Sequence, residues 1–327
     1  MEKKSKSNIN IYAIIVGTIL VLYALSVIFP LLWGIMTSLK ERVDWDQGMY
    51  LSLPNMYYWN LNKEYNALHP GTFDNYDNIF GNYLKLITDL KIDGKTVAFW
   101  MGFNLDIEVV KSVNVNFIGF VTNTLLYAGG TAFFAALAPC IMGYICAKFR
   151  YKFCGFIYAF VLFVMVMPMV GNTTAMLTLM RRLSIYDTIW CMWIKGCTFA
   201  NTYFLIYYAF FSGVSDTYAE AAQIDGASYF RVMCTIYLPL AIKTITTVFL
   251  LQFVTLYNDY NTSLVYIPSH LTLAYAVWHF SNGSSGYNDN APFNLAASMT
   301  LALPMVLLFV VFKNKLMGNI SVGGIKE

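Results

Sequence analysis

The sequence predicts an all-α integral membrane protein with about six transmembrane helices. Apolar residues make up 58% of the chain and charged residues only 12%, whereas a soluble domain carries roughly 25% charged residues. The apolar residues also fall into runs of roughly twenty, the length of helix that crosses about 30 Å of hydrocarbon. So few charges cannot cover a water-soluble fold, and the bilayer is therefore the expected solvent.

Six apolar runs define the expected spans and their topology. We place the spans at residues 11–33, 117–147, 156–176, 189–211, 238–257 and 295–312. The first run is too long for a signal peptide and is expected to be retained. An even number of spans puts both termini on one side, and most of the basic residues near the span ends indicate that this side is cytoplasmic. Arg181 and Arg182, which would lie outside, are the exception.

A polar insertion follows the first span on the outer side. Residues 41–115 carry more acidic than basic side chains and are too long for a simple connection. Within them, residues 83–92 and 95–103 flank Asp93-Gly94, a pair that favours a two-residue hairpin turn because both positions tolerate positive φ. We therefore expect an extracytoplasmic subdomain that contains a β-hairpin.

The cytoplasmic loop 212–237 is the least membrane-like part of the second half of the chain. The polar pair at 215–216 can cap a short helix, and Glu220 would lie near its positive end. Gly226 permits a sharp reversal, after which a second helix can begin near Ser228. Such a helix-turn-helix suits the docking of another protein. The alternative, an amphipathic loop on lipid headgroups, usually carries more basic residues.

Motifs in and after this loop carry a family resemblance. The run Glu220-Ala-Ala-x-x-Asp-Gly-Ala-Ser228, followed by Leu238-Pro-Leu240, resembles the EAA loop of permease subunits in binding-protein-dependent ABC importers. The chain is also similar to the carbohydrate-uptake branch, in particular its MalG-like subunit, at Ser38-Leu-Lys40, Asn123-Thr124 and Tyr257-Asn-Asp-Tyr260. The sequence departs from the family at Lys243, where a proline is frequent, and in the length of the outer insertion.

The resemblance implies a type I ABC importer permease fold with a coupling helix seated in a groove of a separate ATPase. The residues that would form this contact are Glu220, Ala221, Ala222, Asp225, Gly226, Leu238 and Pro239. The tail would reach toward the ATPase dimer interface through Gly318, Gly323, Gly324 and Lys326. The implied parts are then the N-terminus with the first helix (1–40), the insertion (41–115), the permease core (116–313) and the cytoplasmic tail (314–327).

The resemblance also implies partners and a location. The expected partners are a second permease, an ABC ATPase dimer that holds ATP and Mg, an extracytoplasmic solute-binding protein and the lipid bilayer. The chain itself would bind no cofactor, would not be an enzyme, and would lie in the plasma (inner) membrane of a bacterium or an archaeon. The implied cargo is a sugar or an oligosaccharide.

Candidate pathway residues lie in the predicted fourth span and near the outer end of the predicted fifth. Lys195 and Asp259 are charges at membrane depth, where such residues often mark a transport pathway because their burial costs at least a few kcal/mol. Aromatic and amide side chains can stack on a sugar face or bond its hydroxyls, and the candidates are Trp193, Tyr203, Tyr207, Asn258 and Tyr260. Taken alone, each aromatic residue is explained better by helix packing or by an interfacial belt.

Other functional classes lack their signatures. Gly94-Lys95-Thr96 is no phosphate-binding loop, because Asp89 stands where that motif needs its first glycine. The histidines and cysteines lack metal-ligand spacing, and the scattered basic residues do not indicate a nucleic-acid surface. An ion-coupled secondary transporter is the main alternative, although it would usually place several acidic groups at the bilayer midplane. A membrane enzyme, which should show clustered His, Asp and Glu, and a ligand sensor acting through the insertion are further alternatives.

Overall fold

The computed structural model describes residues 11–40, 42–46, 48, 50–54, 80–89, 115–149, 151–167, 172–282 and 290–317. Over these ranges the regular elements are helices, with no β-strand beyond the single bridge residue Val115. The predicted all-α class is therefore confirmed for these residues. The chain forms two compact units, Met1–Asp89 with Phe280–Thr300 and Leu90–His279 with Leu301–Glu327. The helices α15 (Leu273–Asn282) and α16 (Ala291–Met317) contribute to both units.

The first unit contains α1 (Ile11–Ser38), which matches the first predicted span. Its 28 residues correspond to about 42 Å of helix, and apolar side chains along it are exposed, as expected of a lipid-facing helix. At its C-terminal end, Nδ2 of Asn82 donates hydrogen bonds to the carbonyl oxygens of Ser38 (2.8 Å) and Lys40 (2.7 Å). The last carbonyls of a helix have no partner within it, and Asn82 supplies partners at and just beyond this end.

The prediction of a β-hairpin is wrong for its first strand, because most of that segment is helical. Residues Gly81–Asp89 form the helix α4, in which Asn82 and Leu86 are buried. Burial at positions four apart follows the period of a helix and not the alternation of a strand. The hydrogen bonds of Asn82 to the end of α1 depend on tertiary structure, so local sequence could not reveal them. The remainder of the expected hairpin, residues 90–103, lies outside the described residues.

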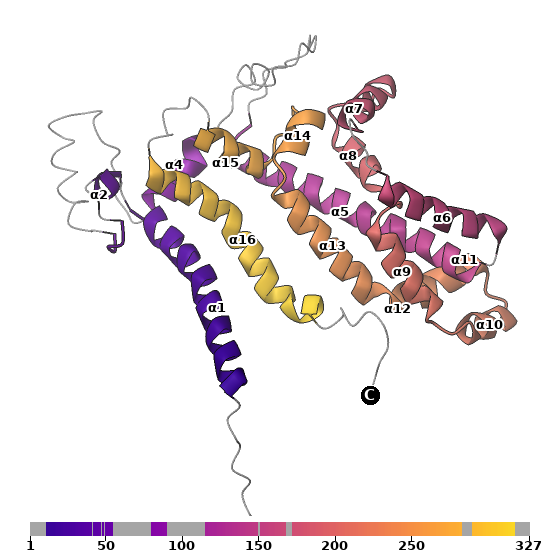
Figure 1. Ribbon diagram of the computed structural model, residues 1–327. Coiled ribbons are helices and arrows are strands. Elements are labelled where there is room, and N and C mark those ends of the chain that lie inside the picture. The colour runs from indigo at the N-terminus through magenta and orange to yellow at the C-terminus, as the bar shows by residue number, and fades with distance from the viewer. Residues whose placement is uncertain are drawn as a thin grey trace, which may run out of the picture. The chain divides into compact units, whose positions relative to one another are not determined.

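The helix α5 (Phe117–Lys148) lies at the centre of the second unit. It packs against α6 (Lys152–Val166), α8 (Ile189–Gly196), α9 (Thr202–Ser212) and α13 (Ile242–Tyr257) (Figure 1). The small side chains of Ala128, Ala132 and Ala136 on α5 are completely or almost completely buried. Small residues at such interfaces let neighbouring helices approach closely, which is how packing holds helices together in a membrane.

Within the described part of the chain, three helices are long and apolar enough to cross a membrane. They are Ile14–Ser38, Phe117–Lys148 and Ala291–Lys313. A fourth crossing results if Tyr229–Leu240 and Ile242–Tyr257, which meet at a bend of 69°, count as one span. The prediction of apolar transmembrane helices is confirmed, but six continuous spans are not found among these residues.

The predicted third and fourth spans are interrupted helices. The helix α6 ends at Val166, and its 15 residues correspond to only about 22 Å. Met167 is extended, as expected of a residue that precedes a proline, and α7 (Asn172–Arg182) follows. In the fourth span α8 ends at Gly196, and Oδ1 of Asn201 accepts hydrogen bonds from the backbone N–H groups of Tyr203 and Phe204 to begin α9.

The loop 212–237 and the beginning of the predicted fifth span form a series of short helices that leads into α13. In chain order they are α10 (Thr217–Ile224), α11 (Tyr229–Val232), the π-helix η2 (Met233–Tyr237) and α12 (Leu238–Leu240). The short helix α14 (Asn261–Tyr266) follows α13. Figure 1 shows α10 near the end of the unit where α9 also ends.

Candidate functional site

The helix-turn-helix expected in the loop 212–237 is confirmed. The helix α10 begins after Asp216, and Oγ of Ser215 accepts a hydrogen bond from the backbone N–H of Thr217 (3.3 Å). Gly226 has a φ of 81°, a left-handed conformation that costs an L-residue roughly 1–2 kcal/mol and glycine little. Oγ of Ser228 then accepts from the N–H of Arg231 and caps α11. The local chemistry of the motif therefore specifies this shape.

The two alanines of the motif lie on different sides of α10. Ala222, together with Ala219, packs against a buried cluster of the second unit that includes Tyr144 and Tyr237. Ala221 is exposed, as are the motif residues Glu220, Asp225 and Gly226. The outward side also carries two large apolar residues, Tyr218 (59% exposed) and Ile224 (86% exposed). We call Tyr218, Ala221 and Ile224 the outer face of α10.

The other two motif residues named from the sequence, Leu238 and Pro239, lie where the chain turns into α13. Leu238 packs against the same cluster as Ala222, while Pro239 is exposed. The π-helix η2 lies immediately before them, and π-helical turns are rare and frequent at functional sites. Pro239 has no backbone N–H to donate, which favours a change of direction here. The chain bends by 69° between α12 and α13.

The two charged pathway candidates contact the buried cluster that includes Tyr127 and Tyr266. The ammonium of Lys195 lies over the ring of Tyr266, 4.2 Å from its centroid, within the range of a cation–π contact. Oδ2 of Asp259 accepts from the hydroxyl of Tyr127 (3.5 Å), and its Oδ1 accepts from the backbone N–H of Thr262 (3.0 Å). Both charges therefore have polar or aromatic partners inside the second unit.

The aromatic and amide candidates are divided between packing positions inside the second unit and the segment that begins at the C-terminal end of α13. Tyr207 is fully buried and Tyr203 partly buried in the cluster that also contacts Ala222. Nε1 of Trp193 donates to the carbonyl oxygen of Leu126 on α5 (3.0 Å). Beyond α13, Nδ2 of Asn258 donates to Val254 of its own helix, and Tyr260 stacks on Trp278 with 5.1 Å between ring centroids. The structure thus does not gather these candidates at one place.

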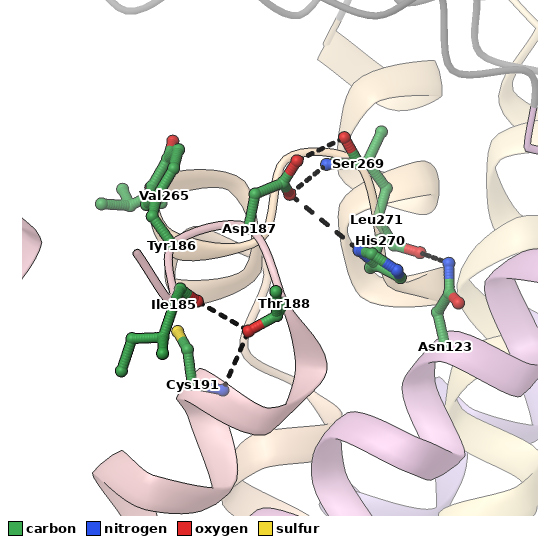
Figure 2. Close-up of polar contacts among 10 residues, drawn as sticks. All are labelled: Asn123, Ile185, Tyr186, Asp187, Thr188, Cys191, Val265, Ser269, His270 and Leu271. Carbon is green, nitrogen blue, oxygen red and sulfur yellow. Dashed lines mark hydrogen bonds and ion pairs between the residues drawn. The ribbon is translucent and has the colours of Figure 1, made fainter. Parts of the chain in front are cut away.

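A polar clasp joins the turn before α8 to the segment that follows α14 (Figure 2). Asp187, with a φ of 59°, accepts hydrogen bonds from the backbone N–H of Ser269 (2.8 Å) and from its hydroxyl (2.5 Å). Nδ1 of His270 lies 3.9 Å from Oδ1 of Asp187. Burial by itself would raise the pKa of Asp187, but the attraction of His270 and the two hydrogen bonds from Ser269 outweigh burial and lower it.

The same segment is also attached to α5. The carbonyl oxygen of Leu271 accepts from Nδ2 of Asn123 (3.2 Å), and the backbone N–H of Leu273 donates to Oγ1 of Thr124 (2.8 Å). Asn123-Thr124, a family-like pair in the sequence, therefore holds the segment after α14 in place. Sequence reasoning identified this pair, but it missed Asp187, Ser269 and His270, which carry no motif.

The remaining site predictions concern the C-terminal tail and metal binding. The tail residues Gly318, Gly323, Gly324 and Lys326 lie outside the described residues. Within the described part of the chain, no group of three or more His, Cys, Asp or Glu side chains could hold a metal ion. Lys148, one of the basic residues near a span end on which the predicted topology rests, donates hydrogen bonds to Val214 and Asp216, contacts that the sequence did not predict.

Comparison with known proteins decides the family. Residues 135–314, which include the whole motif region, match the family described as "Binding-protein-dependent transport system inner membrane component". The chain belongs to this family. The expectation of an ABC importer permease, a transport subunit and not an enzyme, is thereby confirmed.

Named relatives of the permease include sugar transport components. It is 25% identical over 259 residues to the melibiose/raffinose/stachyose import permease protein MelC of Bacillus subtilis, which covers 75% of this chain and 90% of MelC. It is 21% identical over 225 residues to the trehalose/maltose transport system permease protein MalG of Thermococcus litoralis, which covers 67% of this chain and 80% of that protein.

A solved structure supports the fold. The permease resembles a chain from the crystal structure of a bacterial ABC transporter involved in the import of the acidic polysaccharide alginate. The TM-score is 0.66 at 18% identity, and the match covers 96% of this chain and 99% of the other. At this identity the likeness establishes a shared fold.

Proposed function

We propose that the permease imports a sugar or an oligosaccharide as one of two permease subunits in an ATP-driven complex. The observation that carries the proposal is α10, which presents an exposed apolar outer face while Ala222 anchors it to the core of its own unit. Tyr218 (59% exposed) and Ile224 (86% exposed) are both on this face, and large apolar side chains that are exposed together mark a site of interaction with another protein. The sugar class rests on the relatives, since MelC and MalG are named for sugar transport.

Each partner protein in this proposal has a separate role in transport. A dimeric ABC ATPase holds ATP and Mg and receives α10 in a groove, a solute-binding protein delivers cargo from outside, and a second permease completes the pathway. The tail residues 318–326 approach the ATPase, and Glu220, Asp225 and Gly226 contribute to the docked surface. Lys195 and Asp259 line or border the pathway, together with the outer pair Asn258 and Tyr260.

The proposed topology keeps six crossings in the plasma (inner) membrane, with both termini cytoplasmic. The interrupted pairs α6 with α7 and α8 with α9 then serve as the third and fourth crossings, although neither is one continuous helix. Irregular backbone at membrane depth is tolerated where protein buries it or where it borders an aqueous cavity. The insertion 41–115 lies outside the cell in this arrangement.

Closure of the ATPase dimer would move α10 and, through it, the membrane helices. Ala219 and Ala222 pack on the cluster that includes Tyr144 of α5, Phe211 of α9 and Tyr237 of η2. A displacement of α10 is therefore imposed on several helices at once, because a packed core responds as a unit. Alternating access to the cargo would follow from this movement.

Affinity copurification from native membranes in mild detergent tests the proposal. The tagged wild-type chain should retain an ABC-type ATPase and a second permease. Ile224→Asp should lose the ATPase, because a carboxylate on the outer face of α10 would have to be desolvated in the groove. Leu53→Asp is the matched control: Leu53 is also highly exposed (76%), but it lies in the insertion, so that variant should retain the ATPase.

The same experiment separates the proposal from an ion-coupled secondary transporter. A wild-type chain that purifies alone or as a homodimer would contradict the importer assembly. An ATPase that stays bound equally to wild type and to Ile224→Asp would contradict docking through α10. The membership of the chain in the ABC importer family favours the first reading over the secondary transporter.

A further inference from the structure

Lys148, the last residue of α5, has a side chain that joins four parts of the second unit. Its Nζ donates to the carbonyl oxygen of Val214, just after α9, at 2.5 Å, and to Oδ1 of Asp216, at the start of α10, at 2.7 Å. The same ammonium lies 5.2 Å from the ring centroid of Tyr237 in η2. The side chain of Lys148 therefore connects α5 with the α9–α10 connection, with the start of α10 and with the π-helix η2.

The burial of this side chain sets it apart from an ordinary surface ion pair. The Lys148 side chain is only 9% exposed, whereas that of Asp216 is 55% exposed. Exposed pairs contribute little because water screens them and two long side chains must be ordered. Here the ammonium is already held by Val214 and the Tyr237 ring, so little further ordering is needed to engage Asp216. Its place at the C-terminal end of α5 also suits the negative end of the helix dipole.

The aromatic surroundings limit how far Lys148 can move independently. Tyr237 is 1% exposed and lies 4.9 Å from the Tyr144 ring of α5 and 6.1 Å from the Phe211 ring of α9, by ring centroids. Lys148 thus lies over a ring of η2 that packs against rings of α5 and α9, while its ammonium bonds Asp216, the residue immediately before α10. A displacement of Asp216 must either move the end of α5 or break these contacts.

We propose that Lys148 is a positioning residue for coupling, which transmits the displacement of α10 directly to the end of α5. The packing of Ala222 alone would carry motion into the aromatic cluster, whereas Lys148 adds a polar link to α5 itself. The helix α5 contains 32 residues and packs against α6, α8, α9 and α13, so its cytoplasmic end is a point from which motion reaches the whole unit. The inference rests on the proposed function, since it needs an ATPase bound to α10.

Hydrogen–deuterium exchange on the copurified complex tests this role. Each variant is compared without nucleotide and after trapping with ATP, Mg and vanadate, which holds an ABC ATPase dimer closed. In wild type, trapping should change exchange in α10 and in residues 136–148 of α5. In Lys148→Met, which keeps the aliphatic stem but removes the ammonium, the change in α10 should remain and the change in α5 should fall to the part that the packing of Ala222 on the cluster around Tyr144 transmits.

Three further variants distinguish coupling from simple loss of structure. Lys148→Arg retains the charge and should restore the change in α5 at least in part. Asp216→Asn retains a hydrogen-bond acceptor but not the charge, so the change in α5 should be reduced. Lys152→Met removes an exposed lysine four residues after Lys148 and should behave as wild type. A merely structural role for Lys148 would raise exchange equally with and without trapping, and the trapping-induced difference would survive.

The outcomes separate this inference from the proposed function. If the wild-type chain retains no ATPase, the proposed function fails and the coupling role fails with it. If the ATPase binds and Lys148→Met still shows the wild-type change in α5, the coupling role is overturned while the proposed function stands. If Lys148→Met does not assemble, Asp216→Asn decides, and an undiminished change in α5 in that variant overturns the inference.

Discussion

Gly130 of α5 is the position where an added methyl group has the clearest calculable consequence. A Cβ built there would lie 2.1 Å from Nε1 and 2.2 Å from Cε2 of Trp193. The indole would have to retreat until these atoms reach the 3.4 Å at which ordinary contact begins. That movement also breaks the 3.0 Å hydrogen bond from Nε1 to the carbonyl oxygen of Leu126. Gly130→Ala should therefore destabilise the packing of α8 on α5.

The magnitude follows from three contributions. Overpacking typically costs 1–3 kcal/mol, and a lost interhelical hydrogen bond in a membrane protein costs about 0.6 kcal/mol. Alanine offsets this by up to about 1 kcal/mol, because it is a better helix former than glycine. The net expectation is a loss of about 1–3 kcal/mol. Trp193 is only partly buried and can shift toward its open side, so the lower part of this range is expected.

Gly129 provides a matched control, because a Cβ at this adjacent position meets nothing within 4 Å. The assay is the fraction of detergent-purified protein that stays monodisperse after heating, measured for wild type and both variants. Gly130→Ala should lower the apparent melting temperature by a few degrees, and Gly129→Ala should leave it unchanged or raise it. Equal melting of the two variants would refute the steric argument. A Gly130→Ala cost that persists in a Trp193→Ala background would refute the role of the indole.

Three further predictions concern the turn after α10, the polar clasp at Asp187 and the N-terminal cap of α9. Gly226→Ala should cost roughly 1–2 kcal/mol through its positive φ and should weaken ATPase copurification, because Gly226 sets the turn after α10. Asp187→Asn should abolish part of the acid sensitivity of the clasp. The lowered pKa of Asp187 means that its carboxylate stabilises the folded protein above the unfolded-state pKa of about 3.9, and that this stabilisation is lost as pH falls through the folded-state pKa. The thermal stabilities of wild type and of Asp187→Asn should therefore converge as pH drops below about 4. Asn201→Ala removes the cap of α9 and should cost about 1 kcal/mol, seen as faster hydrogen exchange at Phe204 than at residues in the middle of the helix.

The sequence predicted the features that depend on neighbours along the chain. Hydropathy located the long helices α1, α5 and α16, because a span is set by an uninterrupted apolar run. The turn at Gly226 and the cap at Ser228 were also predictable, since both act within a few residues. The hairpin prediction failed at Gly81–Asp89 because the Asp93-Gly94 signal is local, whereas the burial of Asn82 comes from the end of α1.

The sequence by itself determined that this is a membrane protein with a docking motif, since composition, apolar run length and the Glu220–Ser228 pattern are properties of the chain alone. Only the tertiary structure decided which side of α10 each alanine takes and which charges are held together. Lys148 reaches Asp216 across 68 residues of chain, and Asp187 reaches Ser269 across 82. Such contacts depend on how the helices pack, and the physical reason is that a polar side chain acquires its partner only after distant segments have been brought within hydrogen-bonding distance.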